Sequence, residues 1–104
     1  MSKFLEKESS DTLYRAIVSL QDVDECRRFF QDLCTVSELK AMEQRFQVAR
    51  MLSRGMIYHD ILEQTGASSA TISRVNRALN YGSEGYATVM ARLDEAEENG
   101  GQDA

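Results

Sequence analysis

The apolar residues of this 104-residue chain recur throughout with the period of an α-helix, and no segment alternates as a half-buried β-strand would. The sequence contains no proline and is 42% hydrophobic, which is typical of a globular domain rather than a disordered chain. The pattern therefore predicts an all-α protein of about six helices, folded as a single domain over residues 1–104.

Capping residues and glycines divide the helical pattern into segments. Asp22 with Glu25, and Thr35 with Glu38, have the spacing of capping boxes that begin helices. Gly55 suits the left-handed residue that commonly follows a helix. The expected helices cover about residues 10–20, 22–34, 35–54, 57–65, 69–80 and 86–97. The first can extend back toward Phe4, and the last lies in a C-terminal segment, residues 84–97. Residues 98–104 are expected to form a frayed tail.

The first two expected helices have apolar faces wider than one flank of a small monomer usually covers. Their large apolar residues include Leu13, Tyr14, Ile17, Val18, Phe29 and Phe30. A chain this short has few elements of its own to cover both sides. We therefore expect residues 1–54 to be dimerisation helices buried against a second copy. The alternative is that the first two helices wrap around the third within a monomer.

The net charge of −5 at first argues against a nucleic-acid partner, but the charge is unevenly distributed. Residues 1–39 carry a net charge of −3, residues 40–80 carry +3 and residues 81–104 carry −5. The middle segment is the net-basic one, as expected of a DNA-binding region. The alternative is that so small a difference in charge between segments arises by chance in a short sequence.

Few residues in the sequence suggest metal or catalytic chemistry. Cys26 and Cys34 lie in an apolar helical pattern far from His59, the only histidine, so we expect reduced core thiols and no metal site. No nucleophile has a base at a suggestive spacing, and we expect neither an enzyme nor a cofactor. No apolar run approaches the roughly 20 residues of a membrane helix. With no signal-peptide pattern, the expected location is the cytoplasm, without a membrane partner.

Residues 56–80 have the pattern of a helix-turn-helix. Gly66 allows the positive φ of a tight turn, Ala67 is small enough to pack between helices, and Ser68 is a natural N-cap. The residues expected to face inward are Ile57, Ile61 and Thr65 on the first helix and Ile72, Val75 and Leu79 on the second. Such a unit presents its second helix to the DNA major groove, although similar geometry occurs in proteins that bind no DNA.

The outward face of the expected recognition helix, residues 69–79, combines small polar side chains with two arginines. A small first turn lets the backbone approach the groove floor, and the helix N-terminus favours a phosphate. Arginines suit phosphate contacts or bidentate contacts to guanine. The expected DNA-binding residues are Ser68, Ser69, Ala70, Thr71, Ser73, Arg74 and Arg77, with Tyr58 and His59 at the start of the preceding helix.

Two stretches of the chain resemble the Trp repressor family. In TGASSATISRVNRAL the matching residues are Gly66, Ala67, Ala70, Thr71, Ile72 and Arg74. In TVSELKAMEQRFQVARMLSRG they are Thr35, Glu38, Ala41, Arg45, Leu52, Arg54 and Gly55. The resemblance covers residues 33–80 well, and it is strongest to the YerC/YecD group of Trp-repressor-related proteins.

The resemblance implies an intertwined homodimer, with the first, second, third and last helices interlaced between two subunits. It also implies a sequence-specific DNA-binding transcriptional regulator, a repressor, which binds double-stranded DNA at a pseudo-palindromic site. The alternative is an interaction module that kept this fold without sequence-specific DNA binding, which the acidic C-terminal quarter favours slightly.

The resemblance further implies ligand-binding residues, which are Thr35, Arg45, Arg74, Val75 and Ala78. The two arginines match those that stack on the corepressor ring in the Trp repressor. Val75 stands where that family has glycine, and Ala78 where it has a ligand-binding serine. We therefore expect an effector other than L-tryptophan, or none. The expected recognition helix also differs in sequence from that of the Trp repressor, at Ser69 and Arg77. The operator should therefore differ from the tryptophan operator.

Overall fold

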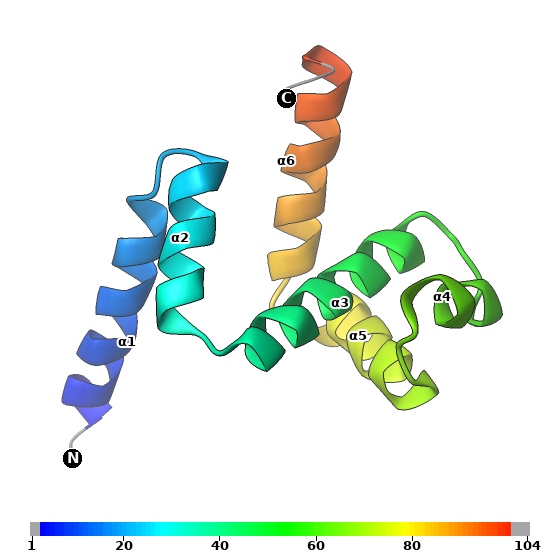
Figure 1. Cartoon of the computed structure of the whole chain (residues 1–104), viewed down its shortest axis with the longest axis horizontal. Coiled ribbons are helices and arrows are strands. Elements are labelled where there is room, and N and C mark those ends of the chain that lie inside the picture. Colours follow the sequence, from blue (N-terminus) through cyan, green and yellow to red (C-terminus); the bar gives the residue numbers. More distant parts are fainter. Residues whose placement is uncertain (1–2, 101–104) are drawn as a thin grey trace. The chain divides into compact units, whose positions relative to one another are not determined.

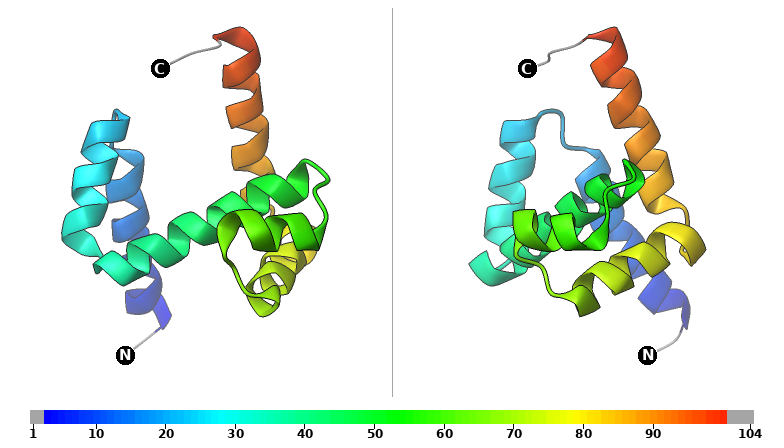
Figure 2. Two further views of the ribbon diagram at one scale, coloured as in Figure 1. Left: turned by 45° about the vertical axis from the view of Figure 1, so that its right-hand side comes forward. Right: turned by 90° about the vertical axis from the view of Figure 1, so that its right-hand side faces the viewer.

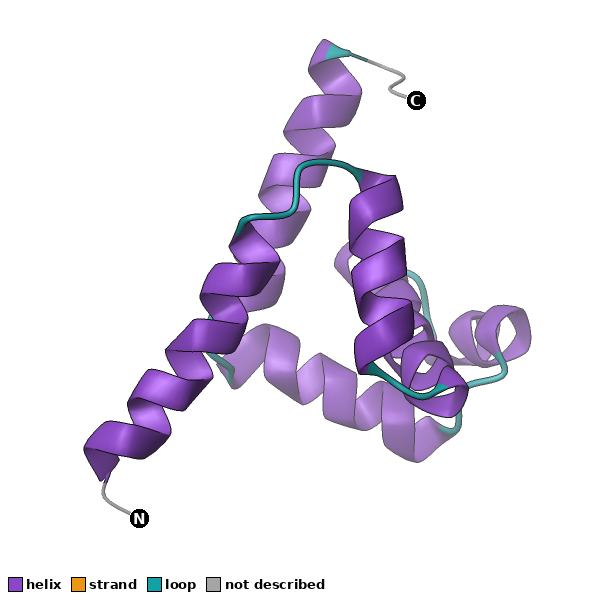
Figure 3. Cartoon of the chain, turned by 60° about the vertical axis from the view of Figure 1, so that its left-hand side comes forward, coloured by secondary structure: helices purple, strands orange, loops and turns teal. Residues whose placement is uncertain are grey.

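The computed structural model describes the backbone of residues 3–100 and the side chains of residues 11–100. All regular structure in this range is helical (Figures 1 and 3). The helices are α1 (Lys3–Val18), α2 (Val23–Leu33), α3 (Val36–Ser53), α4 (Tyr58–Thr65), α5 (Ser69–Tyr81) and α6 (Gly85–Asn99). The predicted all-α class is confirmed, with six helices in the described residues.

The ends of three helices differ from the sequence expectation. The extension of α1 toward Phe4 is confirmed, but α1 ends at Val18, because the Leu20 N–H donates to the Ile17 carbonyl in a tighter closing turn at 3.2 Å. Helix α5 continues to Tyr81. Helix α6 extends to Asn99, so the expected frayed tail was wrong at residues 98–99, while residues 101–104 lie outside the described part.

Both predicted capping pairs begin helices, but only one is reciprocal. At α3 the Thr35 hydroxyl accepts from the Glu38 N–H at 3.1 Å, and the Glu38 carboxylate accepts from the Thr35 N–H at 2.8 Å. At α2 the Asp22 carboxylate accepts from the Glu25 N–H at 2.8 Å. The Glu25 carboxylate reaches past the cap and accepts from the Gln21 N–H at 3.0 Å.

The chain divides into two compact units, residues 1–39 and 40–104. In the first unit, α1 and α2 run in opposite directions (Figure 1), and none of the side chains described there, residues 11–39, is buried. Cys26 and Cys34 are free thiols, as expected, but both are half-buried rather than buried in this chain. Phe29 and Phe30 contact each other edge to face, with ring centroids 5.6 Å apart. This unit leaves large apolar side chains exposed, among them Tyr14, Val18, Val23 and Leu33.

The second unit contains the hydrophobic core, in which residues of α3 pack with the neighbouring helices α4 and α5 (Figure 2). The buried residues are Val48 and Ala49 of α3, Ile61 of α4, Ala67 of the turn, Ile72 and Val75 of α5, and Met90 of α6. The helix-turn-helix therefore packs on the C-terminal half of α3, and α6 contributes one residue to the same core.

One apolar residue of the helix-turn-helix is not where the sequence placed it. Ile57 was expected to face inward with Ile61, but it is 63% exposed. It precedes α4 as the N-cap, with an extended backbone at φ −82° and ψ 156°. Because it is outside the helix, its side chain does not follow the helical register that buries Ile61. Leu79, also expected inward, is half-buried.

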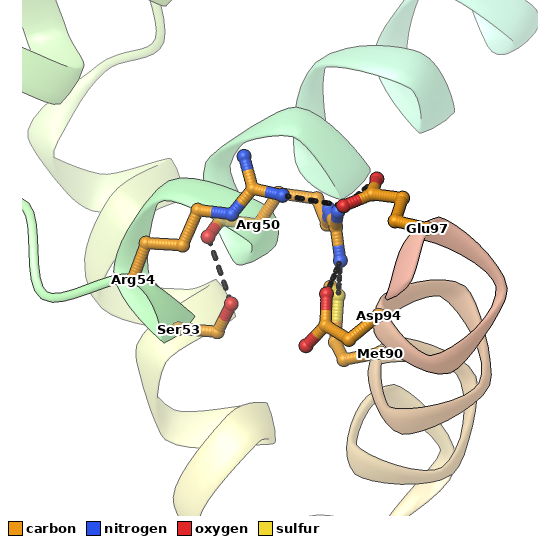
Figure 4. Close-up of polar contacts among 6 residues, drawn as sticks. All are labelled: Arg50, Ser53, Arg54, Met90, Asp94 and Glu97. Atoms are coloured by element: carbon orange, nitrogen blue, oxygen red, sulfur yellow. Dashed lines mark hydrogen bonds and ion pairs between the residues drawn. The ribbon is translucent and has the colours of Figure 1, made fainter. Parts of the chain in front are cut away.

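Ion pairs tie α6 to α3 in the second unit (Figure 4). The Arg50 side chain is only 15% exposed, and its guanidinium lies 3.0 Å from the Asp94 carboxylate and 3.1 Å from that of Glu97. The same guanidinium donates to the Met90 sulfur at 3.5 Å. Arg54 is 3.7 Å from Glu97. Two basic residues of the 40–80 segment are thus engaged by the acidic C-terminal helix.

We expect Arg50→Met to lower the free energy of unfolding by about 1–2 kcal/mol at low salt, because it leaves Asp94 without its cation and Glu97 with only the longer contact to Arg54. Arg54→Met is the matched control and should cost less than about 0.5 kcal/mol, since Arg54 is 57% exposed and its contact is longer. Chemical denaturation at two salt concentrations measures both, and the loss at Arg50 should shrink at high salt. Equal losses in the two variants would contradict a specific role for Arg50.

Candidate DNA-binding surface and ligand site

The turn between α4 and α5 is held by hydrogen bonds within a few residues. Gly66 has φ 73°, and its N–H donates to the Leu62 carbonyl at 2.9 Å. A Cβ on Gly66 would meet no atom within 4 Å, so the left-handed conformation, and not space, is what favours glycine here. Ala67 is 1% exposed and lies in the core, as expected for a small residue between the helices.

The N-cap of α5 is Ser68, as predicted. Its hydroxyl accepts from the Thr71 N–H at 3.1 Å and donates to the Thr71 hydroxyl at 3.1 Å. These two residues were also expected to contact DNA, and in this structure their hydroxyls are engaged with each other. Their first role is thus to begin the helix, and a direct DNA contact from either remains a prediction.

The two faces of α5 are strongly different. Ile72 is 0% exposed and Val75 is 2% exposed, so they anchor the helix to the core. The predicted contact residues Ser69, Ala70, Ser73, Arg74 and Arg77 are exposed. The structure therefore gathers these five residues on the solvent side of one helix, in the arrangement that a recognition helix requires.

Tyr58 and His59 lie at the start of α4 and are both exposed. His59 is close to Glu63, one turn further along, with Nε2 and the carboxylate oxygen 3.4 Å apart. The cap residue Ile57 makes no side-chain hydrogen bond to the first turn of α4. The N–H groups at this helix end are therefore not capped by a side chain, which suits a contact to a phosphate.

The residues expected to bind a ligand have different local environments in this chain, and their role in binding remains a prediction. A groove of about 570 Å³ is lined by Phe46, Ala78, Gly82, Ser83, Gly85, Tyr86 and Val89. Of the expected ligand residues, Ala78 alone lines it. Arg45 and Arg74 are exposed elsewhere on α3 and α5, and Val75 lies in the core. Thr35 belongs to the first unit, where its hydroxyl caps α3.

Sequence reasoning missed the aromatic wall of this groove. The rings of Phe46 and Tyr86 have centroids 6.5 Å apart. Tyr86 is brought there by the connection after α5, in which Glu84 has φ 68°. A Cβ on Gly82 would collide with the Ala78 carbonyl oxygen, so glycine is required where the chain leaves α5. Gly82 and Gly85 lie in the sequence between the expected helices 69–80 and 86–97, and they were the available signal for this bend.

The described residues contain no group of three or more histidine, cysteine, aspartate or glutamate side chains placed to hold a metal ion. Across the same residues, no helix combines the length and apolar character needed to span a bilayer.

Comparison with known proteins identifies the family. The model of the family described as Trp repressor protein matches residues 8–94. The chain is 53% identical over 87 residues to YerC of Bacillus subtilis (strain 168), itself an uncharacterized protein, and the match covers 84% of each chain.

Two crystal structures have the same fold. One is a TrpR-like protein from Eubacterium eligens ATCC 27750, with a TM-score of 0.83 and 50% identity. The other is a Trp-repressor-type structure from Staphylococcus aureus, with a TM-score of 0.81 and 43% identity. Each match covers 89% of this chain and 96% of the other. The chain belongs to the Trp repressor protein family and, within it, to the YerC group.

Proposed function

We propose that the protein is a sequence-specific DNA-binding transcriptional regulator, a repressor, with α5 as its recognition helix. The observation that carries this proposal is the division of α5, in which Ile72 and Val75 are buried while Arg74 and Arg77 are exposed. Membership of the Trp repressor protein family supports the same function. The exposed face offers small residues for close approach and two guanidinium groups for phosphates or guanine.

We further propose that it acts as a homodimer through residues 1–54. The support is the first unit, where no described side chain is buried and large apolar residues such as Val18 and Val23 are 82% and 70% exposed. An isologous dimer presents two equal recognition helices. Its binding site is then a pseudo-palindrome in double-stranded DNA, with half-sites roughly 34 Å apart.

The effector we propose is a small molecule other than L-tryptophan, or none. Val75 is buried in the core and Ala78 lines the groove. By the resemblance described above, these positions match a glycine and a ligand-binding serine of the Trp repressor. Both differences act against a ligand that needs a thin wall and a polar partner.

The rival function is an interaction module of the same fold, which the acidic C-terminal quarter favoured. The ion pairs of Asp94 and Glu97 with Arg50 weaken that argument, because they give two of the acidic residues a role inside the chain. The rival function does not account for the two exposed arginines on α5, whereas DNA binding does.

Salt dependence of DNA binding tests the proposal. On random-sequence double-stranded DNA, we expect the logarithm of the association constant to fall steeply and linearly with the logarithm of salt concentration. Each neutralised phosphate contributes about 0.9 to the slope. Fluorescence anisotropy from about 50 to 200 mM salt measures it. A flat dependence, or no binding at low salt, would favour the interaction module instead.

A further inference from the structure

Gln44 of α3 makes a long-range contact with the turn of the helix-turn-helix. Its side-chain amide donates to the Thr65 carbonyl oxygen at 3.2 Å, and the contact is partly buried and spans 21 residues of sequence. Thr65 is the last residue of α4, where carbonyl groups have no partner within the helix. Gln44 therefore supplies, from another helix, a partner for a carbonyl of the turn.

The other polar groups around this carbonyl are satisfied locally. The Thr65 hydroxyl donates to the Ile61 carbonyl at 2.7 Å and accepts from the Ala67 N–H at 3.0 Å. The Gly66 N–H donates to the Leu62 carbonyl. These bonds shape the turn itself, but none of them joins it to α3. The hydrogen bond from Gln44 joins the turn to α3.

Apolar packing also joins this part of α3 to the helix-turn-helix. Val48 lies one helical turn after Gln44 and packs with Ile61 and Ile72 in the core. Burial of these side chains is favourable but non-directional. A hydrogen bond requires a restricted distance and angle, so it holds the turn to one place along α3.

We propose that Gln44 is a positioning residue for DNA recognition: its bond to the Thr65 carbonyl fixes the turn, and with it the direction of α5, against α3. The effect on DNA comes through α5, and Gln44 itself need not touch DNA. The inference rests on the proposed function, since it states how the DNA-reading face is held. A purely stabilising glutamine would change the melting temperature and leave the order of the turn and the DNA affinity of the folded protein unaltered.

The first experiment needs no DNA. In Gln44→Met, which keeps the side-chain length and removes the donor, hydrogen–deuterium exchange of peptides covering residues 62–72 should be faster than in the wild type. Exchange of α2 and α6 should not change. Gln47→Met is the matched control, because Gln47 is exposed on the same helix, and it should leave the turn as it is. Unchanged exchange in a folded Gln44→Met protein would overturn the proposal.

The second experiment uses the DNA sequence that the wild-type protein selects from a random pool. Gln44→Met should bind this DNA about three- to tenfold more weakly. The salt dependence of binding should not change, because the substitution makes α5 less ordered but removes no phosphate contact. Gln44→Lys, which restores a donor, should recover affinity beyond the gain that Gln47→Lys gives from charge alone. Full affinity in Gln44→Met, or no recovery in Gln44→Lys, would overturn the positioning role. If the wild type selects no DNA, the proposed function fails, and the exchange experiment still decides whether Gln44 orders the turn.

Discussion

Replacing Ile61 with alanine is expected to lower the free energy of unfolding by about 2–5 kcal/mol. Ile61 is fully buried where α4 meets α3 and α5, and it shares the core with Val48 and Ile72. The substitution removes apolar surface that folding buries and leaves a cavity that rigid helices fill only in part. Denaturant unfolding at one protein concentration measures the loss, since dimerisation would make stability concentration-dependent.

Ile57→Ala is the matched control, four residues earlier in the same segment. Ile57 is 63% exposed, so the same change in composition should alter stability by no more than about 0.5 kcal/mol. The two variants distinguish the burial seen in the structure from the burial predicted by the helical pattern, which placed both isoleucines on the inward face. Comparable losses at the two positions would mean that Ile57 is covered, for instance by a partner, and would count against the exposure described here.

Arg77→Ala is expected to weaken binding to the selected DNA by about 1–3 kcal/mol if the guanidinium contacts a base. The reason is its place on α5, exposed and on the side opposite the buried Ile72 and Val75. If the contact is to a phosphate, the loss should be smaller and the salt slope should fall by about one. Anisotropy titrations across salt concentrations distinguish the two cases.

Two further variants sharpen this prediction. Arg77→Lys keeps the charge but loses the planar fork, so it should retain binding only if the contact is to a phosphate. Arg92→Ala removes an exposed arginine from α6 and should leave affinity and slope almost unchanged. If Arg77→Ala resembles Arg92→Ala in both measurements, α5 does not enter the groove with this face.

The local features of the fold were predictable because they depend on residues close together in sequence. The capping box at Thr35 and Glu38, the left-handed Gly66 and the cap at Ser68 each need only a few neighbours, and all three are present. The outward position of Arg74 and Arg77 also follows from local periodicity, once Ile72 and Val75 are recognised as buried. Family membership could be inferred for the same reason, because its motifs lie in this continuous stretch.

The limits of local reasoning appear where two helices decide the environment of one residue. Val48 and Ala49, adjacent residues of α3, are both fully buried, and a single helical stripe does not predict this because it depends on where α4 and α5 pack. Ile57 was misplaced because α4 begins one residue later than the apolar spacing indicated. Arg50 contributed to the net positive charge of residues 40–80, but acidic residues more than 40 positions away engage its guanidinium.

The helical class, the conformation of the turn at Gly66 and the two faces of α5 follow from the amino-acid sequence, since they arise from φ preferences, capping hydrogen bonds and the 3.6-residue period acting within a few residues. The contact from Gln44 to Thr65, the ion pairs that hold α6 to α3, and the groove lined by Phe46 and Tyr86 became visible in the folded chain alone. These contacts join residues far apart in the chain, so they can form only once the helices have packed around a shared core.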